Sequence, residues 1–490
     1  MIFSHRYIGL LTTLLVVIAI RLLIYVWLYL HGYFYGIPWD SFSRTMLSYE
    51  WSQHPYFAPS DGYWLPLQFW LTGSIYYLIR FWNSTSDIVV PVVINNVFFI
   101  GSIIIIYLFT YKITGEILFA FLACLIASIF AGDVFVTYTA LSEPILIFLM
   151  LLSSYLFYDL IINNKNISTK SLLWLTVAVF FASATHYIGW FLAIFIVIFL
   201  FAYLFEAIVN KKKIKVYWII IGIMICGLMP SLWLLNNYLI WGNPLRPIQF
   251  AKQMQQPYIG QMSLFTRFLI TPKVIVKEFY PIAIPGFLAL IFLVFKKPKV
   301  LLFTLPTIFV LGMIWLSTWF ALSAPYQEPR YLVFICWTLI PIMAIVIYYV
   351  WKTKIWPLRI FILSILLLIL CLNIQGISSF KNSFDNNVKI VAYLAKDWFT
   401  VHPGSGRIFI NQDSFAETGV IPVISGYPDR IILLSNNEIN EADANPIHFF
   451  EQKASVWMCI TKNKSFAMDA KQAGLVVNQK GVYYLIQPID

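Results

Sequence analysis

Long apolar segments recur through the first 378 residues, and most of the short loops between them carry lysine or arginine. A helix that crosses a bilayer needs about 20 apolar residues. Hydrophobic residues make up 60% of the chain and charged residues only 11%, which leaves too little polar surface for a soluble globular protein. The sequence therefore predicts an α-helical polytopic membrane protein with about eleven transmembrane helices. The predicted spans cover residues 8–30, 88–111, 115–136, 140–162, 171–187, 188–209, 214–239, 280–296, 300–321, 331–351 and 355–377.

The formal net charge of +11 does not indicate a nucleic-acid partner in a chain of this class. Lysines and arginines in short loops set the orientation of membrane helices, so no nucleic acid binding is expected. The five cysteines are scattered and show neither a CxxC pair nor a disulfide framework. No HExxH or paired-histidine spacing indicates a metal site.

One further run, residues 64–82, is long enough to cross but contains Pro66 and Gly73 and is rich in aromatic residues, as an interfacial helix would be. If it lies flat and the N-terminus is cytoplasmic, five basic loops all fall inside. These loops carry Lys112, Lys165 with Lys170, Lys211–Lys213 with Lys215, Lys296 and Lys297 with Lys299, and Lys352 and Lys354 with Arg359. If the run crosses, all five loops face outward, against the positive-inside rule. We therefore predict interfacial helices in the first outer loop.

With this orientation the outer face receives residues 31–87, about 240–278, the turn 323–330 and everything after about 378. From Lys381 onward the pattern is that of a soluble α/β domain, with a helix at 386–400 and strands at 407–410, 430–434, 455–460 and 481–487. We predict a transmembrane domain at 1–378 and a soluble extracytoplasmic domain at 379–490. The whole is expected to be a multi-pass protein of the plasma or inner membrane with a cytoplasmic N-terminus.

The first outer loop carries the run Pro38-Trp39-Asp40-Ser41-Phe42-Ser43-Arg44. A carboxylate in a partly dry pocket can act as a general base toward an acceptor hydroxyl, which makes Asp40 a candidate catalytic residue. Asp is also a common helix N-cap, and a cap is the simpler interpretation of Asp40 taken alone. Arg44 follows four residues later and is a candidate phosphate ligand, because a guanidinium presents a fork of donors.

Two further ionisable groups begin apolar segments from the outer side. Glu143, in Leu141-Ser142-Glu143-Pro144, is either a helix start favoured by the macrodipole or a group that orients an acceptor. Arg330, followed by Tyr331, is either a phosphate ligand or an interfacial arginine beside an aromatic-belt tyrosine. The residues alone leave both pairs of interpretations open.

Arg21 and His186 are weaker candidates. Arg21 lies within the first apolar segment, where a charge is costly, so it is expected to face the bundle interior or a polar cavity and is a second phosphate candidate. His186, beside Tyr187 in an outer turn, is a site candidate as well. A lone histidine at an interface is more often a hydrogen-bonded structural residue than a catalyst.

The order of these features resembles the GT-C superfamily of glycosyltransferases that use polyprenyl-phosphate sugars. The closest likeness is to the branch of the protein O-mannosyltransferases and aminoarabinose transferases. It covers roughly residues 1–350. It rests on an acidic residue soon after the first span, the run Tyr63-Trp64-Leu65-Pro66-Leu67-Gln68-Phe69-Trp70-Leu71, the Ser142-Glu143-Pro144 start, the Thr185-His186-Tyr187 turn and the Glu328-Pro329-Arg330-Tyr331 turn.

The resemblance implies an inverting, mannosyltransferase-like membrane enzyme. It would move a sugar from a polyprenyl-phosphate donor to a hydroxyl of a protein, lipid or glycan acceptor at the extracytoplasmic face, in contact with membrane lipid. Asp40 would be the base or acceptor-positioning group, with Glu143 beside it. The residues expected to contact the donor or its phosphate are Arg330, Tyr331, Arg21, Arg44 and His186. No cofactor is certain, and a divalent cation shared by Asp40 and Glu143 is left open.

Two other classes of function stay open. A membrane transporter or lipid flippase would favour related halves and broken helices at mid-membrane, but no internal repeat is found in the sequence. A non-catalytic receptor or scaffold would bind its partner through the C-terminal α/β domain.

Overall fold

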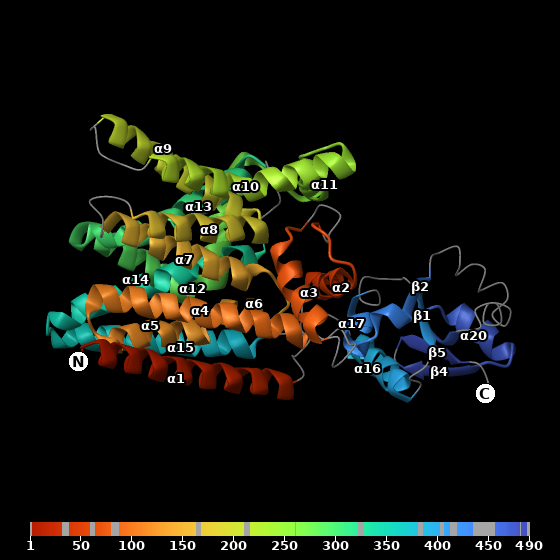
Figure 1. Ribbon diagram of the computed structural model, residues 1–490. Coiled ribbons are helices and arrows are strands. Elements are labelled where there is room, and N and C mark those ends of the chain that lie inside the picture. The colour runs from red at the N-terminus through yellow and green to blue at the C-terminus, as the bar shows by residue number, and fades with distance from the viewer. Residues whose placement is uncertain are drawn as a thin grey trace.

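The computed structural model describes residues 2–31, 39–58, 64–79, 88–162, 168–209, 216–259, 261–321, 328–380, 386–401, 406–411, 419–434, 456–480 and 482–487. These residues form a bundle of long helices and a small α/β domain at one end of it (Figure 1). The first helix begins at the opposite end of the bundle (Figure 1).

Eight helices among the described residues are long and apolar enough to cross a membrane. They are α1 (Ile2–Leu30), α4 (Val89–Thr114), α7 (Glu143–Ile162), α9 (Ile188–Val209), α10 (Val216–Trp241), α12 (Leu264–Lys296), α14 (Val333–Lys352) and α15 (Trp356–Ser378). The 3-10 helix η2 (Pro329–Leu332) precedes α14 directly. Helices suit this sequence because every backbone polar group in hydrocarbon must be paired within the protein.

The other predicted spans are broken or short. α5 (Ile117–Ile129) and α6 (Ala131–Tyr138) are bent by 60° and make a ninth span if taken together. α8 (Thr169–Thr185) and α13 (Leu305–Trp319) are apolar but shorter, and η1 (Pro298–Phe303) leads into α13. The predicted polytopic helical fold is confirmed. The predicted number of eleven spans is not confirmed for the described part of the chain.

The connection from α1 to α4 contributes two short helices that pack against each other, α2 (Trp39–Gln53) and α3 (Leu67–Ile79). They lie at the end of the bundle that faces the α/β domain, as does α11 (Arg246–Ile259) (Figure 1). With 13 residues, α3 is shorter than the roughly 20 residues of a span, in agreement with the predicted interfacial helices. Tyr63 and residues 80–82 of the predicted run lie outside the described residues.

Basic residues of several loops lie at the other end of the bundle, near the N-terminus. The hydroxyl of Tyr107, on α4, donates to the backbone oxygen of Arg6 at 3.3 Å. Lys352, at the end of α14, lies 3.7 Å from Glu116 in the loop between α4 and α5. These contacts are consistent with one shared side for the basic loops, and the membrane orientation itself stays a prediction. Lys165, Lys211–Lys213 and Lys215 lie outside the described residues.

The α/β domain is built on a five-stranded sheet with the order β2-β1-β3-β5-β4. β1 pairs in parallel with β2 and β3, whereas β5 pairs antiparallel with β3 and β4. The strands are β1 (Arg407–Asn411), β2 (Ile431–Leu434), β3 (Val456–Thr461), β4 (Val476–Lys480) and β5 (Tyr483–Gln487). The helical elements are α16 (Asn386–Val401), α17 (Ile421–Ser425), η4 (Pro428–Arg430) and α20 (Lys464–Gln472).

The sequence predicts four of these strands but misses β4. This edge strand reads Val-Val-Asn-Gln-Lys and is largely exposed, so it lacks the apolar alternation that marks a half-buried strand. The small α/β domain is confirmed. α15 ends at Ser378, and the exact domain boundary between residues 378 and 379 stays a prediction.

The α/β domain packs directly on α2. Phe42 of α2 belongs to one buried apolar cluster with Val420 and Ile421 of the α/β domain. Further along α2, the Tyr49 hydroxyl donates to the Asp429 carboxylate at 2.7 Å. The helix that begins beside Asp40 is therefore held on one side by the bundle and on the other by the α/β domain.

Candidate active site

Three helix starts bring charged side chains together at the end of the bundle that faces the α/β domain. Asp40 lies in the first turn of α2, Glu143 in the first turn of α7, and Arg330 in η2. A helix N-terminus favours a carboxylate through its partial positive charge. Arg330 Nη2 lies 2.6 Å from Asp40 Oδ2, and Arg330 Nε lies 3.6 Å from Glu143 Oε1. Asp40 and Glu143 therefore both lie at helix starts and contact Arg330, so the two interpretations of each residue do not exclude each other.

Arg330 has two further partners in its own turn. Its Nε lies 2.6 Å from Glu328 Oε2, and its Nη2 donates to the hydroxyl of Tyr331 at 2.9 Å. The side chains of Arg330 and Glu143 are 6% and 5% exposed, whereas that of Asp40 is 33% exposed. Arg330 therefore holds both carboxylates, and Asp40 is the one of the two that a substrate can reach.

The carboxylates surround a guanidinium rather than a space for a metal ion. In the described part of the chain, no group of three or more His, Cys, Asp or Glu side chains is placed to hold a metal. The fixed charge of Arg330 lies beside both Asp40 and Glu143, and it would repel a divalent cation there. The residues do not fit a cation shared by Asp40 and Glu143.

Arg44 is a buried cation near this cluster, with neutral partners. Its Nη1 donates to Gln68 Oε1 at 2.8 Å, and its guanidinium lies 4.6 Å from the ring centroid of Trp64. Burial lowers the pKa of Arg44, while the charges of Asp40 and Glu143 oppose that effect; a guanidinium remains protonated in proteins. No described carboxylate lies within 4.0 Å of it, and its Nε has no hydrogen-bond partner among the described residues.

His186 is a neutral member of the same neighbourhood. Its ring lies 5.3 Å from that of Tyr331, and its Nδ1 accepts a hydrogen bond from the backbone N–H of Ile188 at 3.1 Å. Burial, followed by the charges of Arg44 and Arg330, lowers the pKa of His186 to about 3. The imidazole is therefore uncharged at neutral pH and contributes shape and hydrogen bonding rather than charge.

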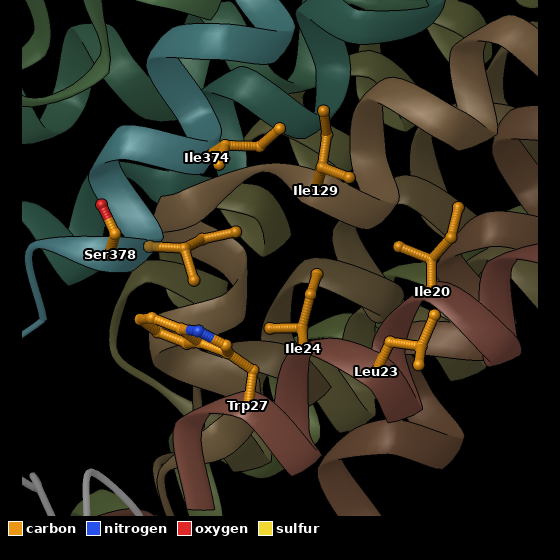
Figure 2. Close-up of a pocket in the computed structure, with 8 residues that line it drawn as sticks. Ile20, Leu23, Ile24, Trp27, Ile129, Ile374 and Ser378 are labelled. Carbon is orange, nitrogen blue, oxygen red and sulfur yellow. The ribbon is translucent and has the colours of Figure 1, made fainter. Parts of the chain in front are cut away.

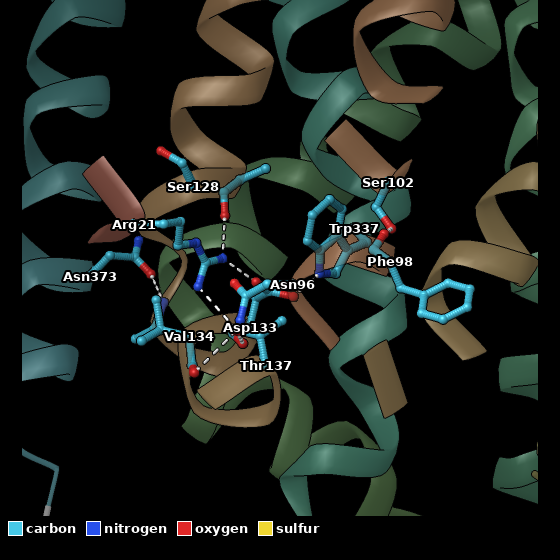
Figure 3. A network of polar contacts seen from close by, with 12 residues as sticks. Arg21, Asn96, Phe98, Ser102, Ser128, Asp133, Val134, Thr137, Trp337 and Asn373 are labelled. Carbon is cyan, nitrogen blue, oxygen red and sulfur yellow. Dashed lines mark hydrogen bonds and ion pairs between the residues drawn. The ribbon is translucent and has the colours of Figure 1, made fainter. Parts of the chain in front are cut away.

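Arg21 does not join Asp40, Glu143 or Arg330. It faces the bundle interior, as predicted, and forms a buried ion pair with Asp133 of α6 (Figure 3). Its Nη1 donates to Thr137 Oγ1 at 3.2 Å, and on the other side of the carboxylate Trp337 Nε1 donates to Asp133 Oδ1 at 2.9 Å. The phosphate-ligand role of Arg21 stays a prediction, and its guanidinium already has a carboxylate partner in Asp133.

The Arg21 network lies at the bend between α5 and α6, where the regular backbone hydrogen bonding is interrupted. Arg21 Nη2 donates to the carbonyl of Ala127 at 3.4 Å, and the backbone N–H of Ala131 donates to Asn373 Oδ1 at 3.1 Å. Backbone groups at membrane depth must be paired within the protein. Arg21 and Asn373 supply such partners, so they stabilise a bend that sends the chain toward Glu143.

An apolar groove lies beside the bend and has a volume of about 500 Å³ (Figure 2). It is formed by α1, α5 and α15. The lining residues are Ile20, Leu23, Ile24, Trp27, Ile129, Ile374, Ile377 and Ser378. Such a lining suits a hydrocarbon chain and offers almost no hydrogen-bonding group.

The sequence interpretation missed Gln68 and Asp133. Asp133 lies inside a predicted span, and the rule that an intramembrane charge is functional or paired would have identified it. Gln68 follows Pro66-Leu67 in the predicted interfacial run, and no spacing pattern points to its partner. Only the packing of α3 against α2 reveals its contact with Arg44.

Three solved structures resemble this chain in fold over most of its length. ArnT from Cupriavidus metallidurans bound to undecaprenyl phosphate matches with a TM-score of 0.60 at 10% identity, covering 97% of this chain and 98% of that chain. ArnT in the apo state matches with a TM-score of 0.55 at 10% identity, covering 92% and 93%. The Archaeoglobus fulgidus oligosaccharyltransferase tethered with an acceptor peptide matches with a TM-score of 0.47 at 10% identity, covering 95% of this chain and 71% of that chain.

No protein-family model matches the sequence, and no curated protein matches it either. At 10% identity, the likeness to ArnT is one of fold. The predicted architecture, a polytopic helical bundle followed by a small C-terminal α/β domain, is confirmed, and ArnT shares this fold over almost its whole length.

Proposed function

We propose that this protein is a membrane glycosyltransferase that moves a sugar from a polyprenyl-phosphate donor to an acceptor hydroxyl, with inversion at the anomeric carbon. The observation that carries the proposal is the meeting of Asp40, Glu143 and Arg330, with the buried Arg44 nearby, at one end of a bundle with the ArnT fold. Such a transfer needs a base for the acceptor and a cation for the leaving phosphate. Both kinds of group are present.

In the proposed step, Asp40 accepts the proton of the acceptor hydroxyl. The acceptor oxygen forms a bond to the anomeric carbon on the face opposite the donor phosphate. The bond from that carbon to the phosphate oxygen breaks, and the lipid phosphate leaves with the electron pair. Arg330 keeps the Asp40 carboxylate in place, and Glu143, held by the same guanidinium, orients the acceptor.

Arg44 is the proposed ligand of the leaving phosphate. The sequence interpretation favours Arg330 for this role, but Arg330 already contacts Asp40, Glu143 and Glu328. Among the described residues, the side chain of Arg44 contacts a neutral amide and aromatic rings, and no carboxylate lies within 4.0 Å of it. A buried guanidinium with no carboxylate in contact attracts an anion more strongly than a guanidinium already shared by three carboxylates.

The donor tail is proposed to lie in the apolar groove between α1, α5 and α15, whose lining is almost entirely aliphatic or aromatic. A carrier of the undecaprenyl phosphate kind, which ArnT binds, has the apolar character that this groove suits. The reaction is proposed to occur on the extracytoplasmic side, where the basic-loop rule puts the α/β domain. A mannosyl donor is the first sugar to test, because the sequence resembles the mannosyltransferase branch.

The test is transfer by the purified protein in liposomes that contain a radiolabelled polyprenyl-phosphate sugar, with mannose first. We expect label to leave the carrier and appear on a protein, lipid or glycan acceptor. Passage of intact labelled lipid across the bilayer without cleavage would instead identify a flippase, a class in which broken helices such as α5–α6 also occur. Binding through residues 379–490 with neither transfer nor transport would identify a receptor.

A further inference from the structure

Gln68 uses both ends of its side chain to join two parts of the proposed active site. Its Oε1 accepts a hydrogen bond from Arg44 Nη1 at 2.8 Å, and its Nε2 donates to the backbone carbonyl of Ala140 at 2.7 Å. Gln68 is 2% exposed, so water does not compete for these bonds. The orientation of the amide follows from its partners, because a guanidinium can only donate and a carbonyl can only accept.

The two partners of Gln68 belong to different parts of the proposed active site. Arg44 is the proposed phosphate ligand, and Ala140 lies three residues before Glu143 in the connection from α6 to α7. The same connection is held from α4, because Asn95 Nδ2 donates to the carbonyl of Thr139 at 2.6 Å. Gln68 thus fixes the position of the phosphate ligand relative to the helix start that carries Glu143.

The close packing of α3 on α2 makes this geometry stiff. A Cβ atom at Gly73 would lie 2.8 Å from the carbonyl oxygen of Ser48 and 2.4 Å from the Trp51 ring, so the two helices approach through a glycine. The guanidinium of Arg44 also lies 4.6 Å from the ring centroid of Trp64. A neutral ring face and a neutral amide orient the guanidinium without placing a carboxylate in contact with it.

We propose that Gln68 is a positioning residue that orients Arg44 toward the phosphate of the lipid-linked donor and, as an amide rather than a carboxylate, keeps that charge available to the anion. This proposal rests on the proposed function, since it assigns the part of the site that receives the donor phosphate. The ligand class is a phosphate ester carried on a long apolar chain.

The experiment measures binding of undecaprenyl phosphate to the purified full chain by native mass spectrometry, alongside thermal unfolding. Undecaprenol, which has no phosphate, and inorganic phosphate, which has no chain, separate the contribution of each part. The variants are Gln68→Glu, which places a carboxylate beside Arg44, and Gln68→Met, which removes both hydrogen bonds without adding charge. Gln472→Glu, on an exposed position of α20 in the α/β domain, is the matched control for the added charge.

For Gln68→Glu we expect undecaprenyl phosphate binding to weaken roughly tenfold or more, because neutralising a phosphate contact costs at least one charge-assisted bond. Gln68→Met should weaken it less, and undecaprenol binding should not change in either variant. A purely structural role predicts the reverse pattern, in which both variants lose stability and both lipids bind less in parallel. Equal undecaprenyl phosphate binding by wild type and Gln68→Glu would refute the role of Gln68.

The two proposals fail in different ways. If the wild-type protein binds undecaprenyl phosphate no better than undecaprenol, the phosphate site and the proposed function are both wrong. If wild type prefers the phosphate and Gln68→Glu keeps that preference, only the role of Gln68 is wrong. If Gln68→Glu does not fold, a loss of phosphate preference in folded Gln68→Met supports the positioning role, and an unchanged preference contradicts it.

Discussion

Arg330 and Asp40 are 290 positions apart in the chain, yet the guanidinium Nη2 of Arg330 donates to the Asp40 carboxylate at 2.6 Å. The same guanidinium lies near Glu143 and Glu328, so one side chain contacts carboxylates at the start of α2, at the start of α7 and directly before η2. Arg330 is buried and Asp40 is partly exposed. The Asp40 carboxylate is therefore fixed by Arg330 and still accessible from solvent. This relationship is the structural basis of the proposed chemistry.

Arg330→Lys should lower kcat strongly while the protein still folds. Lysine keeps the positive charge, but its single ammonium cannot reproduce the planar fork that contacts several partners at once. We expect a loss of about 10²-fold in kcat, the effect of misplacing a reacting group by about 1 Å, because Asp40 would no longer be held in position. Single-turnover transfer from a polyprenyl-phosphate sugar is the measurement. Turnover close to wild type would show that the fork geometry is not needed.

His186 should make the protein less stable as the pH falls. Its folded pKa of about 3 lies below its ordinary value of 6.5, so between these values the unfolded chain binds a proton that the folded protein does not. The contribution of the neutral His186 to the free energy of unfolding is fully present above pH 6.5. As the pH falls from 6.5 toward 3, this contribution decreases by about 1.4 kcal/mol per pH unit for one proton. Thermal unfolding from pH 7 to pH 5 should show a steeper fall for wild type than for His186→Asn. Equal slopes would contradict the buried neutral imidazole.

Arg21 and Asp133 should depend on each other for stability. Removing one partner of a buried ion pair leaves an uncompensated charge and costs about 3–5 kcal/mol. We therefore expect Arg21→Met and Asp133→Asn each to lower stability, and the double variant to lose less than the sum of the two. Unfolding of all four proteins in the same detergent measures this coupling. Additive losses would show that the two side chains act independently.

Tyr49→Phe should loosen the contact between α2 and the α/β domain. The variant removes the hydroxyl that donates to Asp429 at 2.7 Å and leaves the ring in place. A hydrogen bond to a charged group contributes about 1.5–3 kcal/mol. Burial and the Asp429 carboxylate raise the pKa of Tyr49, so the hydroxyl remains a donor at neutral pH. We expect faster hydrogen exchange in residues 39–53 and 421–425 of Tyr49→Phe than in wild type, with exchange in α9 unchanged. Identical exchange in the two proteins would mean that apolar packing alone holds the α/β domain on α2.

Much of the fold follows from local patterns. Apolar segments of span length predict the helices because hydrocarbon requires internally paired backbones. The bend between α5 and α6 could not be predicted in this way, since residues 115–136 contain no proline and have the length of one span. Its stabilising partners, Arg21 and Asn373, lie on helices far away in the chain.

The candidate site was predictable only in part. The sequence shows that Asp40, Glu143 and Arg330 each lie at a helix start. The lysines and arginines of the other loops predict that these three residues lie on the same side of the membrane. The sequence does not show that Arg330 contacts carboxylates while Arg44 contacts a neutral amide, because these contacts depend on how the side chains pack. Arg44 donates to the neutral Gln68 amide, and no periodicity in the sequence shows that contact.

The most direct test of the central claim is the turnover of purified Asp40→Asn with a polyprenyl-phosphate sugar donor. Asparagine keeps the size of the side chain and an acceptor for Arg330 but cannot take a proton. We expect turnover to fall by about 10²–10⁴, the usual contribution of a general base, while folding and donor binding stay near wild type. Asp397→Asn, on an exposed position of α16, should be fully active. Near-normal turnover by Asp40→Asn would contradict the role of Asp40 as the base.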